Sequence, residues 1–391
     1  MKKSASLCIR IQQDSARSLC FDPLAANLSM HHNRALVIAL GAFLWAAPRL
    51  WSPFPPLSSR LFVLNDLVVY SPGFVAVSRY LNGIGLAIVI PAIQSLVADS
   101  TDDSNRGVAF GWLQLTSNIG SILEGLCSVL IASKTIMGIP GWRFAFHLVW
   151  IISVVVGILV HLFAKYPRCS DRDNVAKEHV GGHKNIPWSA LSFIPMWLEL
   201  IGFSHETTAF IMTLFVVLGS LGGLFGGKMG DILAKRLPNS GIIILSQISS
   251  GSAIPIAAVL LLALPDDPST AYMHGLVFFI MGFCISWNGP ATNNPIFAEI
   301  VPEKSRKSIY ALDRSFETIL ASFAPPIVGI LAQHVYGYKP IPKGSSDSIE
   351  IETDRKNNAP LAKALYTAIG IPFTICCTIY SFLYCIYTRD R

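Results

Sequence analysis

The feature that most constrains this chain is the alternation of long apolar stretches with short clusters of charge. Of its 391 residues, 52% are hydrophobic and only 14% are charged, whereas about a quarter of the residues in a soluble domain are charged. The charges that give a net +6 lie in the short polar connections. This layout argues against a water-soluble enzyme, a disordered chain or a nucleic-acid-binding protein. It predicts an all-α integral membrane protein that crosses the lipid bilayer many times.

The apolar stretches predict nine or ten membrane-spanning helices, because a span needs about 20 mostly apolar residues. The segments that approach this length are 35–51, 75–98, 107–133, 143–164, 186–203, 207–227, 241–264, 271–298, 308–335 and 361–387. Two of them are weaker than the rest. The first runs into Pro48 and Arg49, and segment 186–203 is short and carries Glu199.

The polar stretches between these segments are expected to be loops, and their charges assign the two sides of the membrane. Lys and Arg are frequent in 165–185, 228–240 and 299–307, and they are absent from the short loops near 204–206 and 265–270. Positive charge favours the cytoplasmic side, although long loops such as 337–360 count for less. The loops rich in Lys and Arg, and with them the C-terminus, are therefore predicted to be cytoplasmic.

A short pattern occurs twice along the chain, at an offset of 200 residues. Ala98-Asp99 is followed by Arg106, and Ala298-Glu299 is followed by Arg306 at the same spacing. Both copies come directly after an apolar segment and lie on the predicted cytoplasmic side. A repeat of this length in a helical membrane protein indicates two related bundles, as in secondary transporters.

The stretch Gly227-Lys-Met-Gly-Asp231-Ile-Leu-Ala-Lys235-Arg236 resembles the signature loop of the major facilitator superfamily, G-x-x-x-D-[RK]-x-G-[RK]-[RK]. One basic residue and the second glycine of that pattern are replaced here. We expect Gly227 to allow a tight exit from a helix and Asp231 to meet a helix N-terminus. The alternative is an ordinary inner loop that carries the positive charges of its side.

Other stretches resemble the same family. They are Arg79-x-x-Asn82-Gly83, Gly141-Trp142-Arg143 and the segment 294–306. Stretches similar to plant members without an assigned substrate are 81–100, 187–205 and 286–299. The resemblance covers about 35–390 and implies a major-facilitator-type transporter made of two helical bundles. Matched onto its twelve helices, the segments here are helices three to twelve, so helices one and two are expected to be absent or reduced to a remnant.

The resemblance also implies a division of the chain into four parts. They are an irregular tail with a remnant of helix two and of the first signature loop (1–34), an incomplete N-terminal bundle (35–164), a cytoplasmic central loop (165–185) and a C-terminal bundle (186–391).

Polar side chains inside the apolar segments are the candidates for the transport path. An ionisable group at mid-helix costs about 2.5–3.5 kcal/mol to insert, and Asp313, Arg314 and Glu317 are spaced so that they can neighbour one another on a helix. They form either a proton or substrate site or a structural ion pair. The neutral candidates are Asn82, Gln94, Gln114, Asn118, Trp287, Asn288, Asn293 and Asn294. Each of these could instead join two helices by a hydrogen bond.

Gly289-Pro290 and Pro295 are expected to break the helix that carries Trp287, Asn288, Asn293 and Asn294. Such a break leaves backbone groups without helical partners, which is tolerable in a membrane only where they face protein or a water-filled cavity.

The resemblance implies that a second set of residues gates the path by opening and closing its inner end. This set comprises Asp99, Arg106, Gly227, Asp231, Lys235, Arg236, Glu299 and Arg306. Asp231 is expected to dock near Arg106 when the path is open to the outside.

The sequence therefore predicts a secondary active transporter of a small solute, working by alternating access with protons as the coupling ion. No ATP-binding loop or hydrolase motif occurs in the sequence, so no enzyme activity, cofactor or metal is expected. The alternative from a different class is a truncated, transport-inactive membrane protein that acts, if at all, as an interaction partner. A membrane enzyme would need a cluster of catalytic side chains near one interface, and the sequence offers none.

Overall fold

The computed structural model describes residues 38–43, 85, 88–132, 135–136, 139–163, 185–302, 305–339 and 347–390. The predicted tail 1–34, most of the predicted central loop and Asn82 lie outside the described residues. Within the described part the chain is almost entirely helical. Two short antiparallel strands are also present, β1 (Thr135–Ile136) and β2 (Ile139–Pro140). The prediction of an all-α membrane fold is confirmed.

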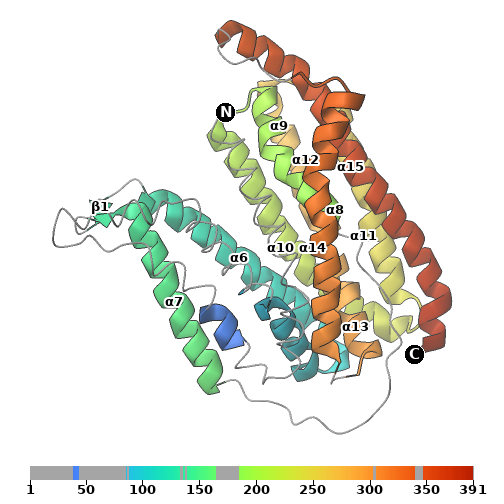
Figure 1. The fold of residues 1–391 in the computed structure, drawn as a ribbon. Helices are drawn as coiled ribbons and strands as arrows, with labels where there is room; N and C mark the ends of the chain where they lie inside the picture. The colour runs from blue at the N-terminus through green and yellow to red at the C-terminus, as the bar shows by residue number, and fades with distance from the viewer. Residues whose placement is uncertain are drawn as a thin grey trace.

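The N-terminal group contains a helix over Ile88–Ser100, α6 (Arg106–Ala132) and α7 (Gly141–Phe163). The β1–β2 hairpin lies between α6 and α7 in the chain, and Figure 1 shows these two helices as one arm of the molecule. Ile38, Ile88 and Ala92 form a small buried cluster against which Val160 packs. This apolar contact joins the first described helical turn to the rest of the arm.

The C-terminal group contains the remaining elements. They are α8 (Asn185–Ala190), η2 (Leu191–Phe193), α9 (Ile194–Ile201), α10 (His205–Arg236), α11 (Gly241–Ala258), η3 (Val259–Ala263), η4 (Pro268–Thr270), α12 (Ala271–Ile285), η5 (Gly289–Asn293), α13 (Asn294–Ile300), α14 (Arg306–Ile330), η6 (Leu331–Val335) and α15 (Asp347–Asp390). The elements η3, η5 and η6 are π-helical turns. The largest buried apolar cluster of the described residues lies in this group and includes Trp197, Phe215, Phe278 and Leu365.

Five helices of the C-terminal group are long and apolar enough to cross a membrane. They span His205–Arg236, Gly241–Ala263, Pro268–Ile300, Arg306–Val335 and Arg355–Tyr384. Large apolar side chains cover their outer surfaces, as at Phe210, Leu276 and Phe382, which are 64%, 59% and 65% exposed. Such a surface is stable in contact with lipid and would aggregate in water.

The prediction of two loops is wrong in large part. Helix α10 continues to Arg236, so most of 228–240 is helical, and α15 begins at Asp347, well inside the expected loop 337–360. Segment 186–203 is not one helix either, because it divides into α8, η2 and α9, with Pro195 in the first turn of α9. A helix satisfies its own backbone hydrogen bonds and can therefore extend beyond the apolar stretch that marks the membrane.

The two groups of helices meet at one end of the molecule and diverge at the other (Figure 1). They meet where α6 begins and α10 ends, close to α13, and they separate toward β1 and α9. The α6–α10 contact is direct, since a Cβ at Gly111 would lie only 2.9 Å from Cα of Leu224.

Candidate functional site

Asp231 joins the two groups of helices at the end of the molecule where they meet, which we call the closed end. Its Oδ1 accepts a hydrogen bond from the backbone N–H of Gly107 at 2.8 Å, and its Oδ2 accepts one from the N–H of Val108 at 2.9 Å. These N–H groups belong to the first turn of α6, where no helical carbonyl can reach them. The positive end of the α6 dipole adds to the attraction. Asp231 therefore caps α6 from the other half of the molecule, at the position that the sequence predicts.

Gly107 and Gly227 let the two helices approach closely enough for this contact. A Cβ at Gly107 would lie 2.5 Å from the carbonyl oxygen of Gly227, and a Cβ at Gly227 would overlap the carbonyl oxygen of Gly107. The expected role of Gly227 in a tight helix exit is wrong, because α10 continues for nine residues beyond it to Arg236. The glycine is needed for backbone-to-backbone packing between the two groups.

A buried ion pair between Arg306 and Asp99 forms a second connection across the closed end. The Asp99 side chain is 1% exposed and the Arg306 side chain 15%. Arg306 also donates from Nε to the carbonyl of Val301 at 3.1 Å and from Nη2 to the carbonyl of Ala298. A buried pair is favourable only when such hydrogen bonds satisfy its remaining polar atoms.

The two copies of the sequence repeat make equivalent contacts. Arg106 donates from Nη2 to the carbonyl of Ala98 at 3.4 Å, as Arg306 does to Ala298. Phe110, which lies 200 residues before Tyr310, packs with that tyrosine and with both alanines in one buried cluster. The centroids of the two rings are 6.5 Å apart. The repeat thus brings its own copies together at the closed end.

The other predicted gating residues lie at the rim of this contact. Lys235 and Arg236 are exposed in the last turn of α10, where positive charge complements the helix dipole. Glu299 is exposed near the end of α13, next to the buried Ala298.

A cavity of about 320 Å³ is lined by eight of the eleven predicted path residues. Its lining comes from both halves of the molecule and consists of Gln94, Gln114, Ile285, Ser286, Asn288, Gly289, Asn293, Asn294, Asp313, Arg314, Glu317 and Phe373. Two pairs in this lining, Gln94 with Asn294 and Gln114 with Arg314, stand at equivalent positions of the repeat. The volume lies within the usual range for small-molecule sites.

The charged part of the cavity lies on α14. Arg314 donates from Nη1 to Oε2 of Glu317 at 3.0 Å, and Asp313 lines the same space. The Arg314 side chain is 39% exposed and the Glu317 side chain 15%. The cavity therefore holds one guanidinium and two carboxyl groups within a largely amide-lined wall.

The predicted break beside the cavity is the π-helical turn η5 over Gly289–Asn293. Asn288 precedes it and donates from Nδ2 to Oγ of Ser250 at 2.8 Å, and in the described part of the chain its buried Oδ1 has no hydrogen-bond partner. Asn293 accepts from the Tyr380 hydroxyl at 3.4 Å. Turns of this kind occur often at functional sites because they redirect side chains from a helix.

Two other path candidates within the described residues, Asn118 and Trp287, do not line this cavity. Asn118 donates from Nδ2 to Oγ of Ser220 at 2.9 Å and so joins α6 to α10. Trp287 packs against the rings of Phe225 and Phe283, with centroids 5.5 and 5.8 Å away. Asn118 thus makes the hydrogen bond between helices that the sequence left open as an alternative. Trp287 does not, because among the described residues its buried Nε1 has no hydrogen-bond partner.

Apart from Gly289, which was expected to break the helix, three lining residues were not among the sequence candidates, namely Ile285, Ser286 and Phe373. Nothing in their local sequence distinguishes them from other residues of a membrane helix. Among the described residues, no group of three or more His, Cys, Asp or Glu side chains is arranged to hold a metal ion.

Comparison with known proteins places this geometry in context. A sequence model of the Major Facilitator Superfamily matches residues 18–192 and 186–342. No curated protein sequence matches the chain.

Solved structures with a similar fold include a bacterial homologue of the iron transporter ferroportin in its outward-facing state. It is 16% identical, with 95% of this chain and 90% of that one covered and a TM-score of 0.55. The proton:xylose symporter XylE is 13% identical, with 94% and 86% covered and a TM-score of 0.54. The human organic anion transporter MFSD10 is 12% identical, with 93% and 82% covered and a TM-score of 0.55. Identities this low establish a shared fold and not a shared substrate.

Proposed function

Because the chain belongs to the Major Facilitator Superfamily and is a multi-pass membrane transporter, we propose that it moves a small polar solute by proton-coupled alternating access. One observation carries the proposal: the polar cavity is lined by side chains from both groups of helices. Gln94 and Gln114 come from the N-terminal group, and Asn293 and Arg314 come from the C-terminal group. Rocking of one group against the other would therefore change the side from which the cavity is reached.

The contacts at the closed end act as the inner gate in this proposal. The charges of the loops favour the cytoplasm for this end, which makes the described conformation outward-open. Opening inward requires Asp231 to leave the first turn of α6 and the Asp99–Arg306 pair to separate. Each contact then stabilises one conformation and not the other, as a gating residue must.

Coupling to protons would use the carboxyl groups of α14. With Asp313 and Glu317 ionised and Arg314 charged, these three groups sum to a single negative charge. One proton on Glu317 neutralises that sum and weakens its bond to Arg314, which frees the guanidinium for the solute. Movement of an unbalanced charge across the membrane costs about 2.3 kcal/mol per 100 mV. The change between the outward-open and inward-open conformations is therefore easier when the three groups together are neutral.

The lining indicates the chemistry of the solute. Asn and Gln side chains offer both donors and acceptors, and the amides of the cavity come from the helix over Ile88–Ser100, from α6 and from the span Pro268–Ile300. Such a wall fits a solute with several hydroxyl or amide groups. The cavity volume of about 320 Å³ limits the solute to a small molecule.

Proton uptake in reconstituted vesicles tests the proposal. The full-length chain is placed in vesicles that enclose a pH-sensitive dye, and a panel of neutral polyols, sugars and amides is added outside. We expect at least one solute to drive proton movement with the wild-type chain, and Glu317→Gln to abolish it while solute exchange between the two sides continues.

Glu199→Gln is the matched control. Glu199 also lies in the C-terminal group, but it pairs with His205 at 3.0 Å outside the cavity, so its variant should behave as the wild type does. Proton movement that survives in Glu317→Gln and Asp313→Asn would contradict the coupling mechanism. Solute exchange that both variants abolish would assign these groups to binding instead.

The arrangement of the chain in the membrane is part of the same proposal. We place the C-terminus in the cytoplasm, with an N-terminal bundle over 35–164, a central loop over 165–185 and a C-terminal bundle over 186–391. The positive charges of the inner loops support this orientation. A protease site added after Arg391 should be cleaved in inside-out vesicles and protected in right-side-out vesicles.

A further inference from the structure

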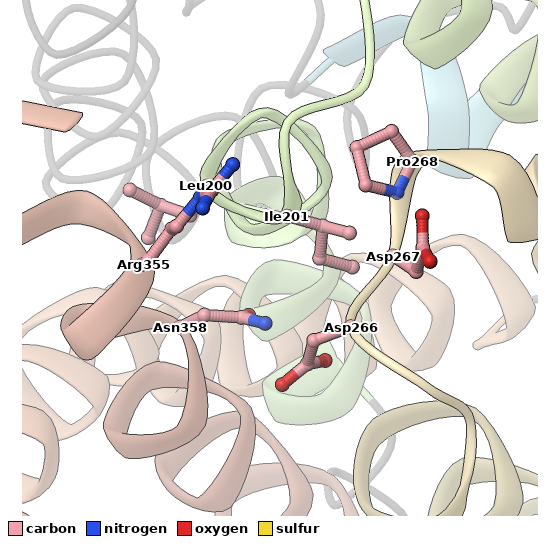
Figure 2. Close-up of a pocket in the computed structure, with 7 residues that line it drawn as sticks. All are labelled: Leu200, Ile201, Asp266, Asp267, Pro268, Arg355 and Asn358. Atoms are coloured by element: carbon pink, nitrogen blue, oxygen red, sulfur yellow. The ribbon is translucent and has the colours of Figure 1, made fainter. Parts of the chain in front are cut away.

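Figure 2 shows a second cavity, of about 330 Å³. It lies at the end of the C-terminal group that carries α9, where the two groups of helices diverge (Figure 1). Its lining comes from the end of α9, the loop before α12 and the start of α15, and consists of Leu200, Ile201, Asp266, Asp267, Pro268, Arg355 and Asn358. It shares no lining residue with the central cavity. The proposed transport cycle gives it no role.

Local backbone geometry holds the walls of this pocket in place. Gly202 ends α9 with a φ of 106°, and a Cβ there would lie 3.1 Å from Cγ of Pro268. Asp267 accepts a hydrogen bond on Oδ1 from the N–H of Ser269 at 2.9 Å, which caps η4. This backbone N–H also lowers the pKa of the Asp267 carboxyl group. The Asp267 carboxylate is thus committed to the protein itself.

Asn358 is the unexplained group in the pocket. It is only 2% exposed, yet neither Nδ2 nor Oδ1 has a hydrogen-bond partner among the residues that the structure describes. The adjacent Asn357 is equally buried and uses both amide atoms, since it binds the backbone N–H and carbonyl of Lys339 at 2.8 Å each. A buried amide without partners destabilises a fold, so the Asn358 amide is positioned to bind a molecule in the pocket.

The charges around this amide define the ligand. Asp266 and Arg355 are exposed, and among the described residues no ion pair engages either side chain. In Figure 2 the Asn358 amide lies between Arg355 and Asp266. Leu200 and Ile201 add apolar side chains to the wall, with Leu200 next to Arg355 in Figure 2.

We propose that this pocket binds a small zwitterion, with an ammonium group at Asp266 and an anionic oxygen group at Arg355. The Asn358 amide hydrogen-bonds the ligand between its two charges, and a short aliphatic chain packs on Leu200 and Ile201. A free amino acid and the headgroup of an ethanolamine phospholipid both have this chemistry. The site lies at the end of the molecule opposite the closed gate.

Thermal unfolding of the purified full-length chain in detergent tests the site. The probes are glycine, β-alanine, 4-aminobutyrate and 6-aminohexanoate, with hexylamine and hexanoate as singly charged controls. We expect one member of the zwitterion series to raise the Tm in a saturable way and the singly charged controls to have at least tenfold weaker effects. Asp266→Asn and Arg355→Gln should each abolish the rise.

Asn358→Leu separates binding from folding. It fills the same space without polar atoms, so the Tm of the unliganded protein should increase while the ligand-induced rise is lost. Lys363→Gln removes an exposed cation from the same helix outside the pocket and should leave the response intact.

Four outcomes would overturn the proposal. They are no response to any zwitterion, an equal response to hexylamine or to hexanoate, a response that survives in Asn358→Leu, and a response lost only in Glu317→Gln, which would place the probe in the central cavity. Repeating the titration in nanodiscs with and without phosphatidylethanolamine identifies the source of the ligand. Loss of the amino-acid response with that lipid assigns the pocket to the lipid headgroup, and retention assigns it to a soluble zwitterion.

Discussion

Replacing Asp231 should open the closed end of the transporter. The carboxylate accepts two hydrogen bonds, at 2.8 and 2.9 Å, from N–H groups that have no other helical partner. A hydrogen bond to a charged group contributes about 1.5–3 kcal/mol, and water recovers part of this once the end is open. We therefore expect Asp231→Ala to destabilise the closed conformation by about 2–4 kcal/mol relative to the open one. Since 1.4 kcal/mol is tenfold, the equilibrium shifts roughly 30- to 700-fold.

Asp231→Asn should have a smaller effect. The amide keeps one acceptor oxygen for Gly107 or Val108 but loses the second acceptor and the attraction of the helix dipole. About half of the effect of Asp231→Ala is expected. A graded response of this kind distinguishes loss of the cap from general unfolding of α10.

The distance between the two halves reports the shift directly. Nitroxide labels are attached at Ser104→Cys and Asn239→Cys, which are exposed positions on opposite sides of the closed end, in a chain whose other cysteines are replaced. Pulsed electron resonance should give one short distance for the wild type and a growing long component for Asp231→Asn and Asp231→Ala.

Asp102→Asn is the matched control for this measurement. Asp102 stands just before η1 at the same end of α6, and its side chain makes no cap hydrogen bond. Its variant changes charge by the same amount and should leave the distances unaltered. An unchanged distance distribution in Asp231→Ala would refute the assignment of Asp231 as part of the gate.

Three further predictions follow from the same contacts. Asp99→Asn leaves a buried guanidinium without its partner, a loss of about 3–5 kcal/mol, and should lower the Tm strongly, whereas Asp102→Asn removes an exposed carboxylate that makes no cap hydrogen bond and should change the Tm little. Gly227→Ala should lengthen the same spin-label distance because its methyl group would meet the α6 backbone, while Gly120→Ala has no atom within 4 Å of the added Cβ and should leave the distance unchanged. The pKa of Asp267 is lower in the folded protein than in the unfolded chain. The ionised carboxylate therefore stabilises the fold at a pH above the unfolded pKa, and this stabilisation is lost as the pH falls through the folded pKa. The Tm measured from pH 7 to pH 3 should therefore fall less in Asp267→Asn than in the wild type.

The helices of the C-terminal group could be located from sequence because membrane insertion depends on the local length of an apolar segment. The break at Gly289-Pro290 was equally local, since proline removes a backbone donor wherever it stands. The helical ends of α10 and α15 were not predictable by this criterion. Their charged turns extend beyond the apolar stretch, where the composition resembles that of a loop.

The candidate site also has a part that the sequence could predict and a part that it could not. The spacing of Arg314 and Glu317 predicted that these side chains are neighbours on one helix, and the hydrogen bond between them on α14 agrees with that prediction. The orientation of Asn118 and Trp287 could not be predicted. A polar side chain on a buried helix can face a cavity or a neighbouring helix, and both satisfy the same local pattern.

The sequence by itself determined the membrane fold, the repeat and the signature that places Asp231 at a helix start, because each depends on residues close together in the chain or on a fixed offset. Tertiary structure alone decided that Gly227 packs on Gly107, and that Asp266 and Asn358 share one pocket. These contacts join residues about 90 to 120 positions apart. Their distances depend on how helices pack against one another, and packing is a property of the assembled bundles that no single segment encodes.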